Sequence, residues 1–441
     1  MINSIKYSFL IKLFLAGVLS LFSNGITSQV YSLQQLLQIS DTANPSIRNA
    51  KLDIEINGKQ KNVYLAARFP KITATGDYKY NALIPGQVVP AAFFGGTPGT
   101  YSTVKFGVPY NLGNTVQLTQ IIYNSQLDYG LAVLDINKKI VDLQLKVTQD
   151  EIKYQIASAY FNLQALNKQK AFIDSNILNI DKLIVNMNAM VKQGLLTPLE
   201  IDKLTLNKLS LQNAIQNINS TKQQVEDALC ILTGIPLQNR ISILSDELIE
   251  KTILVDTTTI YRPQLDLLEA QKQMNLEENK GNKMAYLPNL SFYAAYNYTY
   301  NLKPEDNFRT GIESAFIGLR LDWTLFDGLE KHYKQKMNVI NREKLENQEV
   351  YLKQQLEQNT LNARREIDNQ SNALRLTKNQ LELAQKVYRQ TENLFKQGTI
   401  STNDLIQADN GVQQAQSNLI NTYVKLRQAE IQYLKSIGNI K

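Results

Sequence analysis

The chain has 441 residues, of which 43% are hydrophobic and 20% charged, with a formal net charge of +7. The charge is spread along the chain, so it does not indicate a nucleic-acid partner. With one cysteine (Cys230) and one histidine (His332), an intrachain disulfide is excluded, and neither a zinc site nor a histidine-based triad is expected. No cofactor and no metal are therefore expected, and the composition gives enzymatic activity almost no support.

Residues 1–28 have the pattern of a secretory signal peptide. Lys6 and Lys12 flank the start of the apolar run Leu13–Phe22, and small residues follow up to Ser28. The apolar run is too short for a membrane-spanning helix, so we expect cleavage near Ser28. Because residues 1–28 contain two lysines and no acid, their removal lowers the formal charge from +7 to +5.

The remaining chain contains an internal duplication. Two landmarks recur at a spacing of 218 and two at a spacing of 204, in the same order: Asn44-Pro45 and Arg262-Pro263; Phe69-Pro70 and Leu287-Pro288; Lys192-Gln193-Gly194 and Lys396-Gln397-Gly398; Leu232-Thr233-Gly234 and Ser436-Ile437-Gly438. This predicts a first structural repeat over 29–234, a linker over 235–258 and a second repeat over 259–441.

Each repeat begins with short helices and continues with two segments of period two. The expected strands cover about 71–80 and 104–123 in the first repeat, and about 289–300 and 312–326 in the second. In the last segment Ile317, Leu319 and Leu321 alternate with Gly318 and Arg320. Strict alternation predicts strands with one apolar and one polar face, and the many aromatic residues are typical of strands that end at a membrane interface.

A soluble antiparallel sheet packed on a core would give the same alternation. The membrane interpretation is favoured because the helices joined to these strands are too long to cover a small sheet. Four strands cannot close a barrel, whereas three chains would supply twelve. Residues 81–103 read as a long extracellular loop and residues 301–311 as a short one.

After each strand pair comes a stretch without Gly or Pro, over 131–193 and 329–397. These stretches predict helices of roughly 95–105 Å. The second one has apolar residues at strict intervals of seven, which indicates supercoiling against neighbouring helices: Ile367, Leu374, Leu381, Tyr388 and Phe395. The helical hairpins are expected over 128–234 and 328–438, although an ordinary coiled coil joining globular domains would show the same seam.

Each long helix is predicted to end at a left-handed glycine, Gly194 or Gly398, before the chain returns. Thr197-Pro198-Leu199-Glu200 is predicted to form a capping box with Pro at the first helical position, and Ser401-Thr402-Asn403-Asp404 is its counterpart.

Paired strands, long helical hairpins and tandem duplication together resemble the TolC-like outer membrane efflux proteins (outer membrane factors). The local marks are Asn44-Pro45, Arg68-Phe69-Pro70, the two glycine turns and the strand end Trp323-Thr324-Leu325-Phe326-Asp327-Gly328. The resemblance covers the whole mature chain. It implies a mainly α fold with a membrane β-barrel, in which a homotrimer shares twelve strands in the outer membrane of a Gram-negative bacterium and a helical tunnel extends into the periplasm.

The resemblance also implies a function and partners. The channel would give passive exit to drugs, other small molecules or secreted proteins, delivered by an inner-membrane transporter and a periplasmic adaptor (membrane fusion) protein. Adaptor contacts would surround Gly194 and Gly398, and outer membrane lipid would surround the barrel. The channel itself would perform no chemistry.

At the tunnel tip, Asp404 matches the first acidic position of the family's second hairpin. Gln407 stands where well-known members carry a second acid, and Ile400 where they can carry an arginine. Asp404, Gln407 and Glu200 are thus candidates for the tip constriction, while helix capping is the plainer role of both acids.

Arg320 and Asp322 lie on the polar face of an expected strand and are candidates for the barrel lumen. A cross-strand ion pair is the alternative role of these two residues.

Two other functions remain open at this stage. A periplasmic adaptor or scaffold also uses long helical hairpins, but typically carries one hairpin and no lipid-facing strands. An extracellular fibre protein would explain the heptads but not the duplicated strand pairs.

Overall fold

The computed structural model describes residues 29–243 and 261–439. The expected signal peptide and the linker residues 244–258 lie outside these ranges. The described chain divides into a helical unit and a strand unit. The helical unit contains residues up to 53 together with 141–267 and 348–441, and the strand unit contains 54–140 and 268–347.

The helices of the two repeats match in length, as expected for a duplicated chain. The matching pairs are α3 (Pro45–Ala66) and α6 (Pro263–Met284), with 22 residues each; α4 (Ser125–Lys192) and α7 (Glu330–Lys396), with 68 and 67; and α5 (Pro198–Thr233) and α8 (Thr402–Ile437), with 36 each. The predicted long helices and their return helices are therefore confirmed. In the described ranges, no helix combines the length and the apolar character that a membrane crossing requires.

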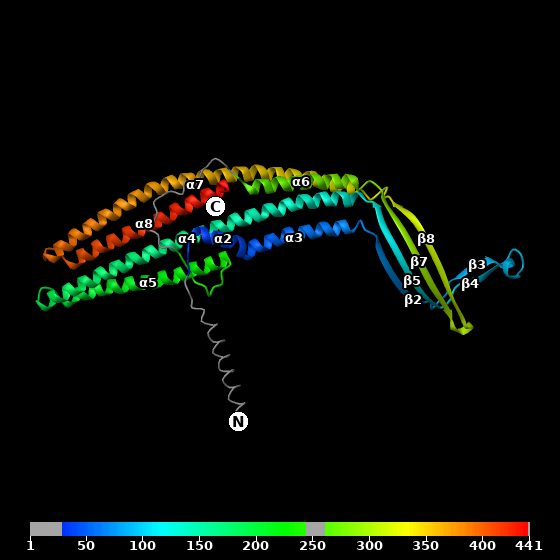
Figure 1. Ribbon diagram of the computed structural model, residues 1–441, viewed down its shortest axis with the longest axis horizontal. Helices are drawn as coiled ribbons and strands as arrows, with labels where there is room; N and C mark the ends of the chain where they lie inside the picture. The colour runs from blue at the N-terminus through cyan, green and yellow to red at the C-terminus, as the bar shows by residue number, and fades with distance from the viewer. Residues whose placement is uncertain (1–28, 244–260, 440–441) are drawn as a thin grey trace, which may run out of the picture. The chain divides into compact units, whose positions relative to one another are not determined.

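The strand unit holds one four-stranded antiparallel sheet (Figure 1). Its strands are β2 (Lys71–Tyr80), β5 (Tyr110–Tyr123), β7 (Asn289–Lys303) and β8 (Phe308–Asp322), in the order β2-β5-β7-β8. The two repeats meet in the middle, where β5 pairs with β7. The outer edges of β2 and β8 have no partner among the described residues.

The expected strand bounds need three corrections. The segment 104–123 is not one strand: β5 begins at Tyr110, and Tyr101–Lys105 is a separate strand, β4, paired with β3 (Gly86–Pro90) in a hairpin within the expected loop. The second pair extends further, so only 304–307 separates β7 from β8. β8 ends at Asp322, and the Trp323 indole Nε1 instead donates a hydrogen bond to the Tyr286 carbonyl at 3.0 Å.

One face of the sheet is apolar and exposed. The paired registers bring Ile72, Val116 and Ile317 to the same face, with exposed fractions of 69%, 48% and 78%. Leu319 and Leu321 continue this face at 65% and 62%. No described element covers it, so this sheet does not pack on a core of its own chain as a soluble sheet does.

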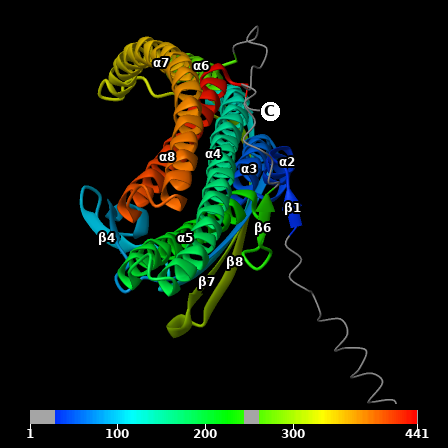
Figure 2. The same ribbon diagram turned by 90° about the vertical axis from the view of Figure 1, so that its left-hand side faces the viewer.

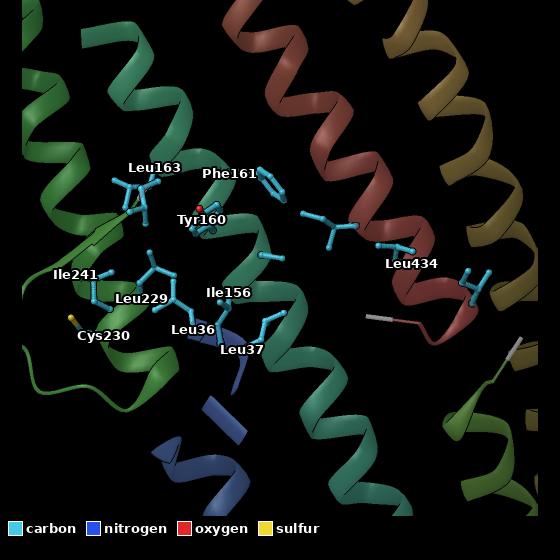
Figure 3. Close-up of a cluster of buried hydrophobic side chains, with 14 residues drawn as sticks. Leu36, Leu37, Ile156, Tyr160, Phe161, Leu163, Leu229, Cys230, Ile241 and Leu434 are labelled. Atoms are coloured by element: carbon cyan, nitrogen blue, oxygen red, sulfur yellow. The ribbon is translucent and has the colours of Figure 1, made fainter. Parts of the chain in front are cut away.

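The helical unit has its own core, drawn in Figure 3. Helix α2 (Leu33–Ala43) contributes Leu36, α4 contributes Ile156 and Leu163, and α5 contributes Leu229, all with no exposed surface. A two-stranded parallel sheet of β1 (Gln29–Tyr31) and β6 (Ile241–Ile243) lies beside this cluster. Complete burial of each of these aliphatic side chains contributes about 1.5–3 kcal/mol.

The recurrent Gly and X-Pro landmarks come together in space. Gly234 ends α5 with φ of +77°, and a Cβ there would lie 2.3 Å from the Ala43 carbonyl oxygen. Gly438 ends α8 in the same way, against the Tyr261 carbonyl. Asn44 Nδ2 donates to the Leu232 carbonyl at 2.6 Å. Each return helix therefore ends on the residues that precede α3 or α6, which explains why these landmarks occur in both repeats.

Candidate functional site

The two glycine turns lie together at one end of the helical unit (Figure 2). Gly194 follows α4 and Gly398 follows α7, and both have φ of +72°, the left-handed conformation expected for a helix end. A cavity of about 400 Å³ separates the turns and is lined by both. Both turns therefore lie at the same end of this unit.

A hydrophobic cluster holds the tip together. All four helices of the two hairpins contribute buried side chains, which are Ile180, Leu183, Met187, Leu204, Leu211, Phe395 and Leu405. The predicted seam on α7 supplies Phe395 from its last turn, with Leu381 buried two heptads before it. Ile400 packs half-buried against this cluster.

Asp404 closes a complete capping box at the start of α8. The Ser401 backbone N–H donates to Asp404 Oδ2 at 3.0 Å, and the Asp404 N–H donates to Ser401 Oγ at 3.3 Å. The Ser401 hydroxyl also donates to Asp404 Oδ2 at 2.7 Å, and these bonds lower the pKa of the Asp404 carboxyl. The predicted cap is confirmed, and it leaves an exposed carboxylate that is ionised at neutral pH.

The predicted capping box at Glu200 is wrong. The Thr197 side chain makes no capping hydrogen bond. Glu200 Oε1 instead accepts from Lys203 Nζ at 3.0 Å, and this contact lowers the pKa of Glu200. The reason is that Lys203, one turn further along α5, offers a charge-assisted bond that competes with the backbone amide.

Gln407 lies exposed on α8, one turn after Asp404. Its amide carries no charge, so in this chain Asp404 is the single exposed acid of the first turns of α8.

Arg320 and Asp322 lie on the polar face of β8, opposite Ser291 and Asn289 of β7. The Arg320 guanidinium lies 5.2 Å from the centre of the Tyr293 ring, a cation–π contact. Within the described ranges neither Arg320 nor Asp322 forms an ion pair inside the chain, and the outer edge of β8 is open.

The same polar face carries chains of side-chain hydrogen bonds that were not predicted from the sequence. Asn81 donates to Asn111 at 2.7 Å, and Asn111 donates to Asn301 at 2.6 Å. Thr115 donates to Asn297 at 2.8 Å, further along the sheet. The asparagines of these chains alternate with apolar residues, which is a signal of a polar face, but the cross-strand register that pairs them cannot be read from the sequence of either strand alone.

The chain has known relatives by family and by fold. Residues 254–439 match the family model described as Outer membrane efflux protein. No curated protein matches the sequence of the chain.

Three solved structures illustrate the fold. The CmeC outer membrane channel of Campylobacter jejuni matches with a TM-score of 0.72 and 13% identity, covering 92% of this chain and 85% of that one. The outer membrane protein VceC of Vibrio cholerae matches with a TM-score of 0.68 and 13% identity, covering 92% and 96%. The MtrE outer membrane channel of Neisseria gonorrhoeae, in its open state, matches with a TM-score of 0.66 and 14% identity, covering 93% and 89%.

The fold is therefore that of outer membrane channels. Residues 254–439 match the outer membrane efflux protein family, and the resemblance to TolC-like outer membrane efflux proteins that the sequence indicated is confirmed. The alternative of a periplasmic adaptor is not favoured by these relationships.

Proposed function

We propose that three copies of this chain form a passive exit duct through the outer membrane. The observation that carries the proposal is the sheet with an exposed apolar face and two open edges. In water, such a face is an aggregation hazard and such edges recruit further strands. In a bilayer the apolar face is solvated by lipid, and the edges must be paired, because unsatisfied backbone groups are too costly there.

Pairing between copies satisfies both edges. β8 of one protomer runs antiparallel to β2 of the next, continuing the alternation within the sheet. Three copies with four strands each give twelve strands, which is wide enough for an open lumen. The polar face would then line the lumen, and its paired amides offer solutes a neutral, hydrogen-bonding wall.

Arg320 and Asp322 are proposed lumen residues near the periplasmic end of the barrel. Their support is that they share a face with the amide chains and point away from the apolar face. In a trimer they would form rings of three cations and three anions, which tune selectivity without blocking a wide passage.

The tip is proposed to narrow the tunnel, with Asp404 as its acidic ring. Its exposed, ionised carboxylate supports this role, whereas Glu200 is neutralised by Lys203 and Gln407 is uncharged. The turns at Gly194 and Gly398, with the cavity between them, are the proposed contact region for a periplasmic adaptor. Such an adaptor, and an inner-membrane transporter that supplies the energy, would deliver drugs, other small molecules or secreted proteins.

The channel function is tested by conductance. Purified protein reconstituted in a planar bilayer should give stable, discrete conductance steps, and cell fractionation should recover it with the outer membrane. Recovery in the soluble periplasm without conductance would contradict the duct and favour the adaptor.

The tip role of Asp404 is tested with two variants that separate charge from capping. Asp404→Asn removes the charge, whereas Ser401→Ala removes the hydroxyl bonds of the cap and keeps the charge. An acidic ring predicts that only Asp404→Asn lowers cation selectivity. Equal cation selectivity in both variants and the wild type would show that Asp404 only caps α8.

A further inference from the structure

One heptad position of α8 holds a buried side chain with a polar group in four successive heptads. Its residues are Asp409, Gln416, Tyr423 and Glu430, with exposed fractions of 9%, 7%, 2% and 2%. The first three contact the first hairpin: Asp409 accepts from Asn207 Nδ2 at 3.3 Å, Gln416 accepts from Asn176 Nδ2 at 2.9 Å, and the Tyr423 hydroxyl donates to Gln164 at 3.3 Å. A coiled-coil position of this kind normally holds an apolar side chain, and a polar one reduces stability while fixing register.

Asp409 differs from the other members because it is a carboxyl group with only neutral partners. Its Oδ2 accepts from Gln413 Nε2 at 2.6 Å and from Asn207. Glu430, by contrast, has the Arg427 guanidinium at 2.5 Å. No ion pair to Asp409 occurs within the described ranges, so an ionised Asp409 would be a buried charge held only by amides.

A cavity of about 350 Å³ adjoins Asp409 and is lined by α4, α7 and α8. On α7 it meets Tyr388, Arg389 and Glu392, and on α4 it meets Lys182. Arg389 and Lys182 are exposed, and Glu392 pairs with Lys396 at 2.7 Å.

The charged groups of α5 near this position are already paired. Asn207, which faces Asp409, is neutral, and its neighbour Lys208 pairs with Asp181 of α4 at 2.6 Å. Lys182 and Arg389 line the same cavity as Asp409, so they are cations that an ionised Asp409 could attract.

Burial raises the pKa of Asp409, and the bonds from Gln413 and Asn207 lower it by less. Burial, and then Asp409 itself, also raise the pKa of Tyr388, so the phenol stays neutral at physiological pH. We call the contact surface between α8 and α5 the seam. A carboxyl whose pKa is higher when the seam is packed than when it is open binds its proton more tightly in the packed state. The packed seam is therefore favoured at low pH and is progressively weakened as pH rises from the ordinary pKa of Asp to the raised one.

We propose that Asp409 is a proton-dependent contact between α8 and α5, which keeps the second hairpin packed on the first while it is protonated and loosens the seam when it ionises. On ionisation the carboxylate would draw water, Lys182 or Arg389 in through the adjoining cavity. If the proposed channel function holds, acidification would favour a closed tip.

The test is hydrogen–deuterium exchange of the full-length protein in detergent, followed in α8 segment 405–416 and corrected for the intrinsic pH dependence of exchange. Between the two pKa values, wild-type protection should fall by up to tenfold per pH unit. Asp409→Asn, which keeps the shape and both hydrogen bonds, should remain protected throughout. Glu382→Gln is the control, because it removes an exposed carboxyl of α7 and should leave the wild-type profile in place.

The idea is overturned if the wild type and Asp409→Asn have the same pH profile. A second variant, Asn207→Leu, removes one bond that stabilises the carboxylate and should move the wild-type midpoint to higher pH, and an unmoved midpoint would also refute it. Exchange reports on the seam whether or not the protein conducts, so failure here is distinguishable from failure of the channel function in the bilayer.

Discussion

The apolar face of the sheet gives a quantitative prediction at Ile317. This side chain is 78% exposed in the single chain and lies at the centre of the apolar run of β8, opposite Ala294. If the face were in water, Ile317→Arg would change the free energy of unfolding by no more than about 0.5 kcal/mol. At the midplane of a bilayer the same change costs about 2–4 kcal/mol for each protomer, or about 6–12 kcal/mol for a trimer.

The assay is urea unfolding of the protein in lipid vesicles, with the amount of assembled protein in outer membranes as a cellular readout. Ser314→Arg is the matched control, because Ser314 lies on the same strand but on the polar face, beside Asn297. We expect a large loss for Ile317→Arg and a small one for Ser314→Arg. Equal, small effects would refute the assignment of this face to lipid.

Three further predictions concern the helical unit. Gly234→Ala should destabilise the helical unit by about 1–3 kcal/mol, because φ is positive and a Cβ would lie 2.3 Å from a backbone carbonyl oxygen. Gly411→Ala, in an open helical position, should stabilise the unit by about 0.5–1 kcal/mol. Thermal unfolding measures both changes. Cys230 is 1% exposed and burial raises the pKa of its thiol, so maleimide should label it only after denaturation, and rapid labelling of native protein would contradict this core. Because capping lowers the Asp404 pKa, the cap stabilises α8 above the ordinary pKa of Asp, and this stabilisation is lost as pH falls through the lowered pKa. Ser401→Ala removes the hydroxyl bonds of the cap and keeps the backbone bond, so it should reduce that acid sensitivity of α8 in hydrogen exchange.

The sequence predicted the helices well because their signals are local. Runs without Gly or Pro, apolar residues at intervals of seven and paired landmarks are all legible along the chain, and the long helices end within a few residues of the expected positions. Because the chain is duplicated, each of the matching elements could be predicted from two different stretches of sequence.

The incorrect or missed predictions concern residues whose structure depends on their contacts with neighbouring groups. Glu200 had the right spacing for a capping box, but Lys203 provides a stronger partner. The strand predicted from residue 104 is interrupted, and Gly107, with φ of +139°, lies in the break before Tyr110. Asp409 is spaced at seven residues from Gln416, yet its burial against α5 could be known only once the two hairpins were packed together.

The central claim, that several copies share one barrel, is tested most directly by the detergent-corrected mass of the protein extracted from outer membranes. The account predicts the mass of three chains in one particle. A monomeric mass would leave the edges of β2 and β8 unpaired in the membrane, and would contradict the shared barrel and the duct that depends on it.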